Sequence, residues 1–241
     1  MKLRLVITGS GAYLAQDLIA RLGSDPNCEF ILGLDLHPGS VAVNCPAEFL
    51  QFDLTRPWEE MAELFRTRAV NTGLHLAWQF NPIHDRERQH QVDVEGSRNF
   101  FRSAEAVGLK RIVYTGSTTV YVNPASPTEP PFLTEETELS GTPRYLYSKH
   151  KVEVDRMAQE FITRHPEMQV VILRAPIVLG QHTQNIVSKM IEWPWRSFPW
   201  MFQVRGADPP MQFISEEDIA AILYRALTSE AAGVFNAAGD G

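Results

Sequence analysis

Leu3-Arg4-Leu5-Val6-Ile7-Thr8-Gly9-Ser10-Gly11-Ala12-Tyr13-Leu14-Ala15 is a short apolar run that passes through two glycines into a stretch with helical spacing. A secretory signal peptide would continue with a longer apolar segment and a cleavage site, and neither is found here. The stretch therefore predicts a first strand, a tight turn and a first helix. At the start of such a helix, backbone N–H groups and the helix dipole together favour an anionic group such as a pyrophosphate.

Short apolar runs alternate with longer amphipathic stretches along the rest of the chain, which is typical of βαβ units. The expected strands span 3–8, 29–35, 47–52, 72–77, 110–116, 169–174 and 233–237. The expected helices span 12–22, 57–67, 84–107, 143–164 and 215–227. Because βαβ crossovers are right-handed, we predict an α/β fold with a doubly wound parallel sheet of the Rossmann type. The ligand crevice of such a sheet lies at the carboxyl ends of its strands.

The sequence changes character after the expected sixth strand, because tryptophans alternate with prolines and regular periodicity is lost. We expect a dinucleotide-binding domain over residues 1–175 and a small substrate-side segment over 176–241, interleaved with a returning helix and strand. Trp193, Trp195 and Trp200 have two interpretations. They line an apolar substrate pocket, or they pack against the sheet or a partner subunit.

Composition excludes several classes of protein. The 241 residues are 44% apolar and carry a formal net charge of -7, which suits one globular domain with a small appendage. This acidic balance provides no field that would attract nucleic acid or an anionic membrane. No apolar run approaches the roughly 18 residues of a membrane helix. Cys28 and Cys45 lack metal-ligand spacing, so we expect free thiols and no metal in a cytoplasmic protein.

A carboxylate ends the second expected strand. Asp35 follows the glycine turn by roughly 20 residues, the separation at which an acidic side chain accepts hydrogen bonds from an adenosine ribose. Leu36, His37 and Pro38 come next, so no arginine or lysine stands ready for a ribose phosphate. The sequence therefore favours NAD over NADP as cofactor.

Acid-base residues stand near the start of the helix expected over 143–164. Tyr145 and Lys149 are four residues apart, so the ammonium and the phenol share one helix face. A phenol has an ordinary pKa of about 10, and a nearby cation moves that pKa toward neutrality. Ser117, at the end of an earlier strand, can hold the same substrate oxygen. These residues suit redox chemistry at a C–OH/C=O carbon.

Spacing alone leaves alternatives for both positions. Tyr147 and Lys151 are also four residues apart on the same helix. Thr118 takes the role of Ser117 if the strand end is shifted by one residue. His75 is interpreted as a packed strand residue.

In order along the chain, these residues resemble the extended short-chain dehydrogenase/reductases, in particular their NAD-dependent epimerase/dehydratase branch. Several ordered matches are more specific than any single motif. The matching segments are 8–15, Asp35, Asp53-Leu54, His75-Leu76-Ala77, Gly96-Ser97-Arg98-Asn99, 113–121, 145–149 with Glu153, 173–176 and 211–218.

The resemblance implies a set of site residues and partners. It implies Ser117, Tyr145 and Lys149 as catalytic residues, because Ser148 precedes and Glu153 follows that lysine as in the family. It implies a small-molecule substrate, either a nucleotide sugar or a more apolar carbonyl compound, and a homodimer formed through the two longest helices. The residues it implies for NAD are Gly9, Gly11, Ala12, Tyr13, Leu14, Asp35, Leu36, Asp53, Leu54, Leu76, Ala77, Trp78, Tyr145, Lys149 and Pro176.

Three features depart from the family pattern. Ala12 and Ala15 stand where glycines are common, and Asp93 stands where asparagine is usual. Family members also continue beyond the last expected strand, so we expect the substrate-binding part to be incomplete. These departures motivate an alternative function, a non-catalytic dinucleotide-binding sensor or scaffold protein.

Overall fold

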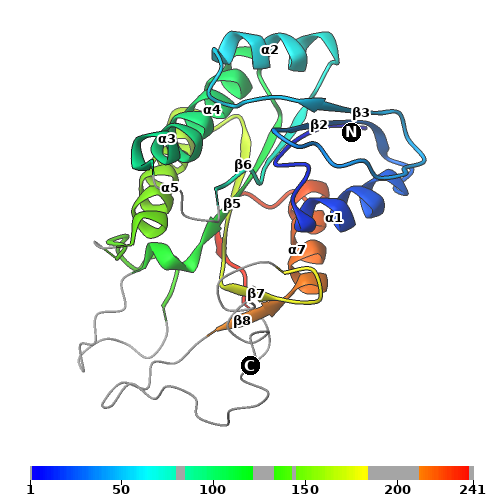
Figure 1. Cartoon of the computed structure of the whole chain (residues 1–241). Coiled ribbons are helices and arrows are strands. Elements are labelled where there is room, and N and C mark those ends of the chain that lie inside the picture. Colours follow the sequence, from blue (N-terminus) through cyan, green and yellow to red (C-terminus); the bar gives the residue numbers. More distant parts are fainter. Residues whose placement is uncertain (1, 80–84, 122–132, 143–144, 184–211, 239–241) are drawn as a thin grey trace.

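The computed structural model describes residues 2–79, 85–121, 133–142, 145–183 and 212–238. Within this part of the chain, seven parallel strands form one sheet in the order β3-β2-β1-β4-β5-β6-β9 (Figure 1). They are β1 (Leu3–Thr8), β2 (Cys28–Asp35), β3 (Ala47–Gln51), β4 (Thr72–His75), β5 (Arg111–Ser117), β6 (Gln169–Ala175) and β9 (Gly233–Asn236). The chain runs outward from β1 to β3 and returns to β4 on the other side of β1. The predicted doubly wound α/β fold is confirmed.

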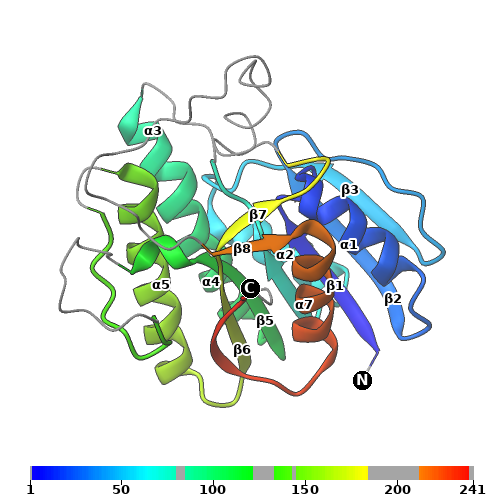
Figure 2. The same cartoon turned by 90° about the horizontal axis from the view of Figure 1, so that it is seen from below.

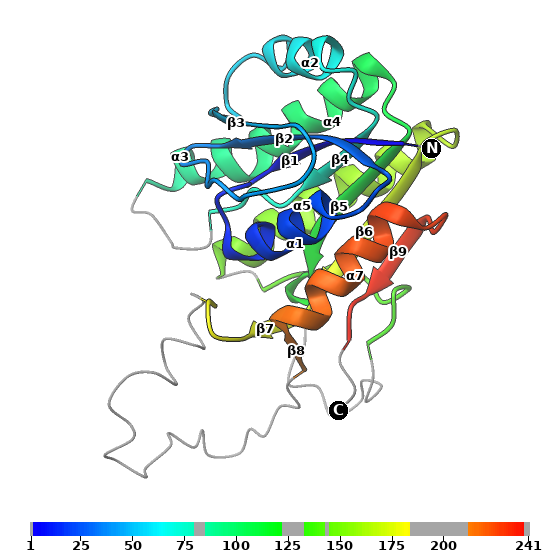
Figure 3. The ribbon, with the colours of Figure 1, turned by 90° about the vertical axis from the view of Figure 1, so that its right-hand side faces the viewer.

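Helices cover both faces of the sheet (Figure 3). On one face α1 packs against α7, and on the other α4 packs against α2 and α5. The helical elements of the described residues are α1 (Tyr13–Gly23), α2 (Trp58–Thr67), α3 (Arg86–His90), η1 (Gln91–Glu95), α4 (Gly96–Val107), η2 (Thr118–Val120), α5 (Leu146–Arg164) and α7 (Glu216–Thr228). Because both faces are covered, the central strands are apolar on both sides.

The first strand illustrates this packing. Leu5 and Ile7 of β1 belong to the core that contains Leu18 and Ile19 of α1. Val6, between them, belongs to the core on the opposite face. Successive strand residues point to opposite faces, so a strand buried on both sides needs an unbroken apolar run. This explains the sequence pattern that predicted β1.

The helix expected over 84–107 is not one regular helix. α3 ends at His90, the π-helical turn η1 spans Gln91–Glu95, and α4 begins at Gly96. A π-helical turn inserts one extra residue and changes which side chains face inward. Asp93 lies in this turn and is buried, with 1% of its surface exposed.

The strand expected over 72–77 is shorter than predicted. β4 ends at His75, which pairs with Thr8, the last residue of β1. Gly9 turns the neighbouring chain away after that point, so only one more bond follows, from the Leu76 N–H to the Thr8 carbonyl at 3.0 Å. Residues 76–79 therefore leave the sheet as a loop.

A second, two-stranded sheet was not predicted. β7 (Ile177–Leu179) and β8 (Phe213–Ser215) pair in parallel beyond the carboxyl ends of the main strands (Figure 2). Both strands have only three residues, too few for a recognisable alternation. Trp193, Trp195 and Trp200 lie outside the described residues.

The last helix and the last strand lie beyond the expected domain boundary at residue 175 but pack as parts of the main sheet's fold. β9 pairs with β6, and α7 packs on α1. Arg111 of β5 donates hydrogen bonds to the carbonyls of Ala226 and Ala231 at 2.9 and 3.0 Å. The buried guanidinium therefore fastens the end of α7 and the turn into β9 to the start of the sheet.

The two cysteines are free thiols whose Sγ atoms lie 3.9 Å apart. Burial raises the pKa of Cys28 to about 12, so this thiol is protonated at neutral pH. Among the helices described here, none is both long and apolar enough to cross a membrane. The described residues also contain no cluster of three His, Cys, Asp or Glu side chains suited to a metal ion.

A buried ion pair fastens α5 to the sheet. The Arg174 guanidinium of β6 donates from Nε and Nη2 to the two carboxylate oxygens of Asp155 at 2.9 and 2.8 Å. Its Nη1 also donates to the Tyr121 hydroxyl at 2.6 Å. Arg174 and Asp155 are 1% and 0% exposed, so each charge depends on the other for its solvation.

Asp155→Ala is expected to lower the free energy of unfolding by about 3 to 5 kcal/mol, because it leaves the Arg174 guanidinium buried without a counter-charge. Urea denaturation measures this loss. Glu63→Ala breaks the exposed pair between Glu63 and Arg66 and serves as control, with an expected loss below about 1 kcal/mol. Equal losses in the two variants would contradict the role assigned to the buried pair.

Candidate active site

The glycine turn after β1 is built by close backbone packing. Gly9 has a φ of +77°, and a Cβ there would lie 2.6 Å from the backbone nitrogen of Ala77. A Cβ on Gly11 would lie 2.2 Å from the carbonyl oxygen of His37. Both glycines are therefore required, because the turn lies directly against the chain leaving β2 and the chain leaving β4.

The start of α1 is suited to an anion. Ala12 is the N-cap residue and offers no side-chain acceptor to the first N–H groups of the helix. Tyr13 and Leu14 follow as the first helical residues, both partly exposed. Uncapped N–H groups beside a glycine turn are the donor set that a pyrophosphate needs, so this part of the chain fits a dinucleotide.

Asp35 lies where the sequence predicted, at the end of β2 beside this turn. Its Oδ2 accepts from the Gly11 N–H at 3.0 Å, and its Oδ1 accepts from the His37 N–H at 2.8 Å. The side chain is partly exposed, and Leu36 after it is 40% exposed. The carboxylate thus lies beside the glycine turn, at the carboxyl end of β2.

Asp53 has partners within the chain. Its Oδ2 accepts from Arg88 Nη2 at 2.7 Å, and its Oδ1 accepts from the Thr55 N–H and hydroxyl at 2.9 and 2.8 Å. Burial acts to raise the pKa of Asp53, but these hydrogen bonds and the arginine charge outweigh it, so the pKa lies below its ordinary value. Leu54, next to it, is buried at 7% exposure.

Other predicted cofactor residues lie just after the carboxyl ends of β4 and β6. Leu76 is buried, and Ala77 contacts the glycine turn through its backbone. Pro176 is buried directly after β6. Burial raises the pKa of Tyr13 to about 12, and the charge of Glu216 adds to this effect. Tyr13 is therefore a neutral phenol at the start of α1.

The structure brings Ser117 together with Tyr147. Their hydroxyls are hydrogen-bonded, and the Ser117 Oγ also accepts from the Thr119 N–H and hydroxyl at 3.3 and 3.0 Å. Ser117 ends β5 and is 7% exposed. Burial raises the pKa of Tyr147, against the lowering effect of the bond from Ser117. A serine and a tyrosine hydroxyl therefore meet at the carboxyl end of the central strands.

Lys151 lies one helical turn after Tyr147 and is buried at 3% exposure. Its Nζ donates to the Thr115 carbonyl at 2.9 Å and stands 3.5 Å from the ring centroid of Trp78. It also lies 5.8 Å from the ring centroid of Tyr147. Burial lowers the pKa of Lys151 to about 7, although the charges of Asp93 and Asp155 act to raise it. The ammonium is thus held by a carbonyl and an aromatic face.

Tyr145 and Lys149 lie elsewhere. Tyr145 is the N-cap residue of α5 and is 44% exposed, with its ring stacked on that of Tyr147 at 5.6 Å. Lys149 is exposed. Burial raises the pKa of Tyr145, so the lowering expected from a neighbouring lysine is not found. Within the described residues, no side-chain hydrogen bond joins this pair to Ser117. Thr118 makes no such bond to Ser117 either.

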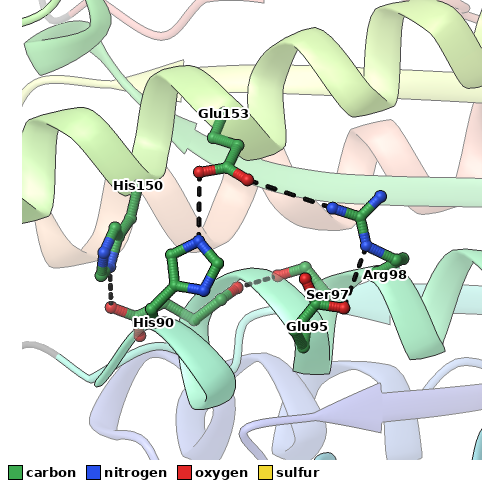
Figure 4. A network of polar contacts seen from close by, with 7 residues as sticks. His90, Glu95, Ser97, Arg98, His150 and Glu153 are labelled. Carbon is green, nitrogen blue, oxygen red and sulfur yellow. Dashed lines mark hydrogen bonds and ion pairs between the residues drawn. The ribbon is translucent and has the colours of Figure 1, made fainter. Parts of the chain in front are cut away.

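The helix face explains the difference between the two pairs. Tyr147, Lys151 and Asp155 are spaced by four residues, and this face of α5 turns toward the sheet. Residues 145, 149 and 153 form the next face and are all exposed. Glu153 contacts His90 and Arg98 at the surface, at 3.3 and 4.0 Å (Figure 4). Only the first face contacts the strands of the main sheet.

Ser148, which supported the other register in the sequence, has a structural task. It is fully buried, donates to the Thr119 carbonyl at 2.6 Å and accepts from the Thr142 N–H at 2.7 Å. These bonds fasten the turn after Ser117 to the first turn of α5. The serine therefore helps to hold Ser117 and Tyr147 at a fixed separation.

Family membership follows from comparison of the sequence. Residues 5–238 match the NAD dependent epimerase/dehydratase family. The chain belongs to this family. The family is NAD-dependent, so the resemblance and the cofactor predicted from the sequence are confirmed at this level.

A relative in the family is the uncharacterized protein Rv0501 of Mycobacterium tuberculosis (strain ATCC 25618 / H37Rv). It is 25% identical over 243 residues, which cover 98% of this chain and 62% of the relative. The chain thus spans less than two thirds of the length of this curated relative.

Solved structures of similar fold include complexes with NAD and a uridine nucleotide. MoeE5 in complex with UDP-glucuronic acid and NAD has a TM-score of 0.77 and 18% identity, covering 98% of this chain and 76% of MoeE5. The Bordetella bronchiseptica enzyme WbmG in complex with NAD and UDP has a TM-score of 0.74 and 20% identity, covering 99% and 73%. At such identities these likenesses establish the fold.

Lys151→Met is expected to change how stability depends on pH. The pKa of Lys151 is about 7 in the folded protein, below its ordinary 10.5, so between these values the unfolded chain binds more protons. The contribution of Lys151 to stability therefore rises with pH across this window. The free energy of unfolding of Lys151→Met minus that of the wild type should therefore be larger at pH 6 than at pH 10, by on the order of a few kcal/mol.

Urea denaturation at a series of pH values measures this difference. Lys149→Met is the matched control, because it removes a lysine from the exposed face of the same helix. It should leave the pH dependence of the wild type unchanged. A parallel pH dependence for Lys151→Met and the wild type would contradict the buried ammonium.

Proposed function

We propose that this protein oxidises or reduces a substrate at a C–OH/C=O carbon with NAD, using Tyr147 as the acid-base residue. The observation that carries the proposal is the hydrogen bond between the buried Ser117 and the half-buried Tyr147, one helical turn from the buried ammonium of Lys151. Ser117, Tyr147 and Lys151 have no evident structural purpose here, because apolar side chains would fill the same space without the free-energy cost of removing polar groups from water.

Different residues would bind different parts of NAD. The turn from Gly9 to Leu14 would hold the pyrophosphate, Asp35 the adenosine ribose, and Lys151 with Trp78 the region next to the nicotinamide. Bound NAD would supply the carbon that accepts and returns hydride. Regeneration of NAD within one turnover would give epimerisation or dehydration, whereas its release would give a dehydrogenase or reductase.

Proton transfer is assigned to the side chains. Tyr147 exchanges a proton with the substrate oxygen, and the Ser117 hydroxyl holds that oxygen in place. Burial raises the pKa of Tyr147, which keeps the phenol protonated in the free protein and suits donation to a carbonyl. The Lys151 ammonium stabilises the phenolate that remains after donation.

Nucleotide sugars are the first substrate class to test. MoeE5 and WbmG, which share the fold, bind UDP-glucuronic acid and UDP, each with NAD. A more apolar carbonyl compound is the second class. The homodimer through the helices expected over 84–107 and 143–164, and the cytoplasmic location, stay predictions.

NADH is expected to bind the purified chain and to bind about tenfold or more tightly than NADPH, because the Asp35 carboxylate would repel a ribose phosphate. Energy transfer from tryptophan to the reduced nicotinamide measures both affinities. Asp35→Ser is the control and should reduce the preference between the two cofactors. Absence of NADH binding at millimolar concentration would refute the proposal.

Tyr147→Phe is expected to lower turnover by about 100-fold or more, because it removes the exchanged proton while the ring stays in place. NADH binding should remain nearly unchanged. Tyr145→Phe is the matched control and should keep most activity. Nicotinamide absorbance with a panel of UDP-sugars and apolar ketones provides the measurement. The reverse pattern would return the chemistry to Tyr145 and Lys149.

The alternative is a non-catalytic dinucleotide-binding sensor or scaffold. Ala12 in the glycine turn and Asp93 in η1 motivate it, since both depart from the family pattern. A tyrosine hydroxyl bonded to Ser117 next to a buried lysine argues against it, because a sensor has no proton to transfer. Any substrate-dependent change in NADH absorbance would exclude this alternative.

A further inference from the structure

Asp93 is a buried carboxylate outside the Ser117, Tyr147 and Lys151 set. It lies in η1, and both of its oxygens have protein partners. Oδ1 accepts from the Gln79 N–H at 2.9 Å, and Oδ2 lies 2.9 Å from His150 Nδ1. A carboxylate that is 1% exposed requires such partners to be tolerated.

Each partner of Asp93 adjoins a wall of the Lys151 site. Gln79 directly follows Trp78, whose ring lies 3.5 Å from the Lys151 Nζ. His150 directly precedes Lys151 on α5. One carboxylate therefore fixes both the loop that carries the aromatic wall and the helical turn that carries the ammonium.

The solvent side of this pair is closed by a surface network (Figure 4). The His90 ring lies edge-on to the His150 ring, with centroids 5.2 Å apart, and its Nε2 lies 3.3 Å from Glu153 Oε2. His150 is only 3% exposed behind this network. The bond between Asp93 and His150 is therefore shielded from water, which strengthens the electrostatic effect of the carboxylate.

Charged and titratable groups face Lys151 from four elements. Asp93 faces it from η1, and Asp155 and Tyr147 face it from α5. The groups on the strands are His75 of β4 and Tyr114 of β5. His75 is uncharged, because burial lowers its pKa to about 3. Burial also raises the pKa of Tyr114, so this phenol is neutral.

The two carboxylates near Lys151 differ in their partners. Asp155 is paired with the permanent charge of Arg174 through two hydrogen bonds. The side-chain partner of Asp93 is His150, an imidazole and not a permanent cation. The charge of Asp93 is therefore not committed to a fixed ion pair as that of Asp155 is.

We propose that Asp93 is a positioning residue for Lys151, which holds the two walls of the lysine site through Gln79 and His150 and stabilises the ammonium by its charge. The functional consequence rests on the proposed roles of Tyr147 and Lys151. The negative charge of Asp93 then offsets part of the free-energy cost of burying the Lys151 ammonium against the Trp78 ring.

Asp93→Asn separates the charge from the geometry. The amide oxygen can accept from the Gln79 N–H, and the amide nitrogen can donate to His150 Nδ1. The expected result is that Lys151 loses its proton about one pH unit lower than in the wild type, a roughly tenfold larger acid constant. The probe is the ε-carbon signal of ¹³C-lysine, titrated by NMR without cofactor and assigned by its absence in Lys151→Arg.

Glu153→Gln is the matched control, because it removes a carboxylate from the surface network and leaves the buried pair in place. It should leave the Lys151 titration unchanged. An unchanged titration in Asp93→Asn, or an equal shift in Glu153→Gln, overturns the proposal. A merely structural role for Asp93 would lower stability without moving the titration of the lysine.

The charge interaction between Asp93 and Lys151 can also be measured at Asp93 in the variant Lys151→Met. This second test does not depend on the folding of Asp93→Asn. Linkage requires that loss of the Lys151 charge raise the pH at which Asp93 is protonated. The side-chain carboxyl carbon of Asp93 should therefore titrate about one pH unit higher in Lys151→Met than in the wild type. Identical titrations overturn the proposal.

These outcomes are independent of the proposed function. A shifted Lys151 titration together with full turnover by Tyr147→Phe would refute the assigned chemistry and leave the coupling intact. Loss of turnover by Tyr147→Phe with an unshifted lysine would refute the coupling alone.

Discussion

Burial of the Lys151 ammonium is the constraint on which the rest of the site depends. A charge removed from water must be compensated by nearby groups. Here the Thr115 carbonyl accepts from it, the Trp78 ring lies against it, and two carboxylates face it from different elements. Each of these groups is in turn held by the fold: Thr115 by β5, and Asp155 by its ion pair with Arg174. The cation therefore links α5, η1 and the sheet.

The parallel sheet brings these groups together. The carboxyl ends of its strands lie along one edge, so segments far apart in sequence meet there. Gly9 after β1 contacts Ala77 after β4, and Ser117 at the end of β5 bonds to Tyr147 at the start of α5. Ala12, which departs from the family pattern, lies along the same edge, whereas Ala15 one turn later on α1 is part of the core.

Sequence patterns predicted the elements well where periodicity was long, as in the central strands. The choice between the two tyrosine–lysine pairs was harder, because 145/149 and 147/151 have the same spacing. A signal lay further along α5. Positions that continue from Lys149 are Glu153, Arg156 and Glu160, all charged, whereas those that continue from Lys151 are Val154, Ala158 and Phe161, all apolar and buried. The apolar side of an amphipathic helix packs against the sheet, so the lysine on the same side as these apolar residues is the one that points at the sheet.

The sequence by itself determined the doubly wound sheet, the glycine turn and the acidic residue at the end of β2, because these depend on local periodicity and backbone freedom. Only the tertiary structure decided which tyrosine meets Ser117, that Asp93 joins Gln79 to His150, and that Trp78 covers the ammonium. Those contacts join residues brought close by the pairing of strands and the docking of α5. Their energies depend on burial, which no local pattern specifies.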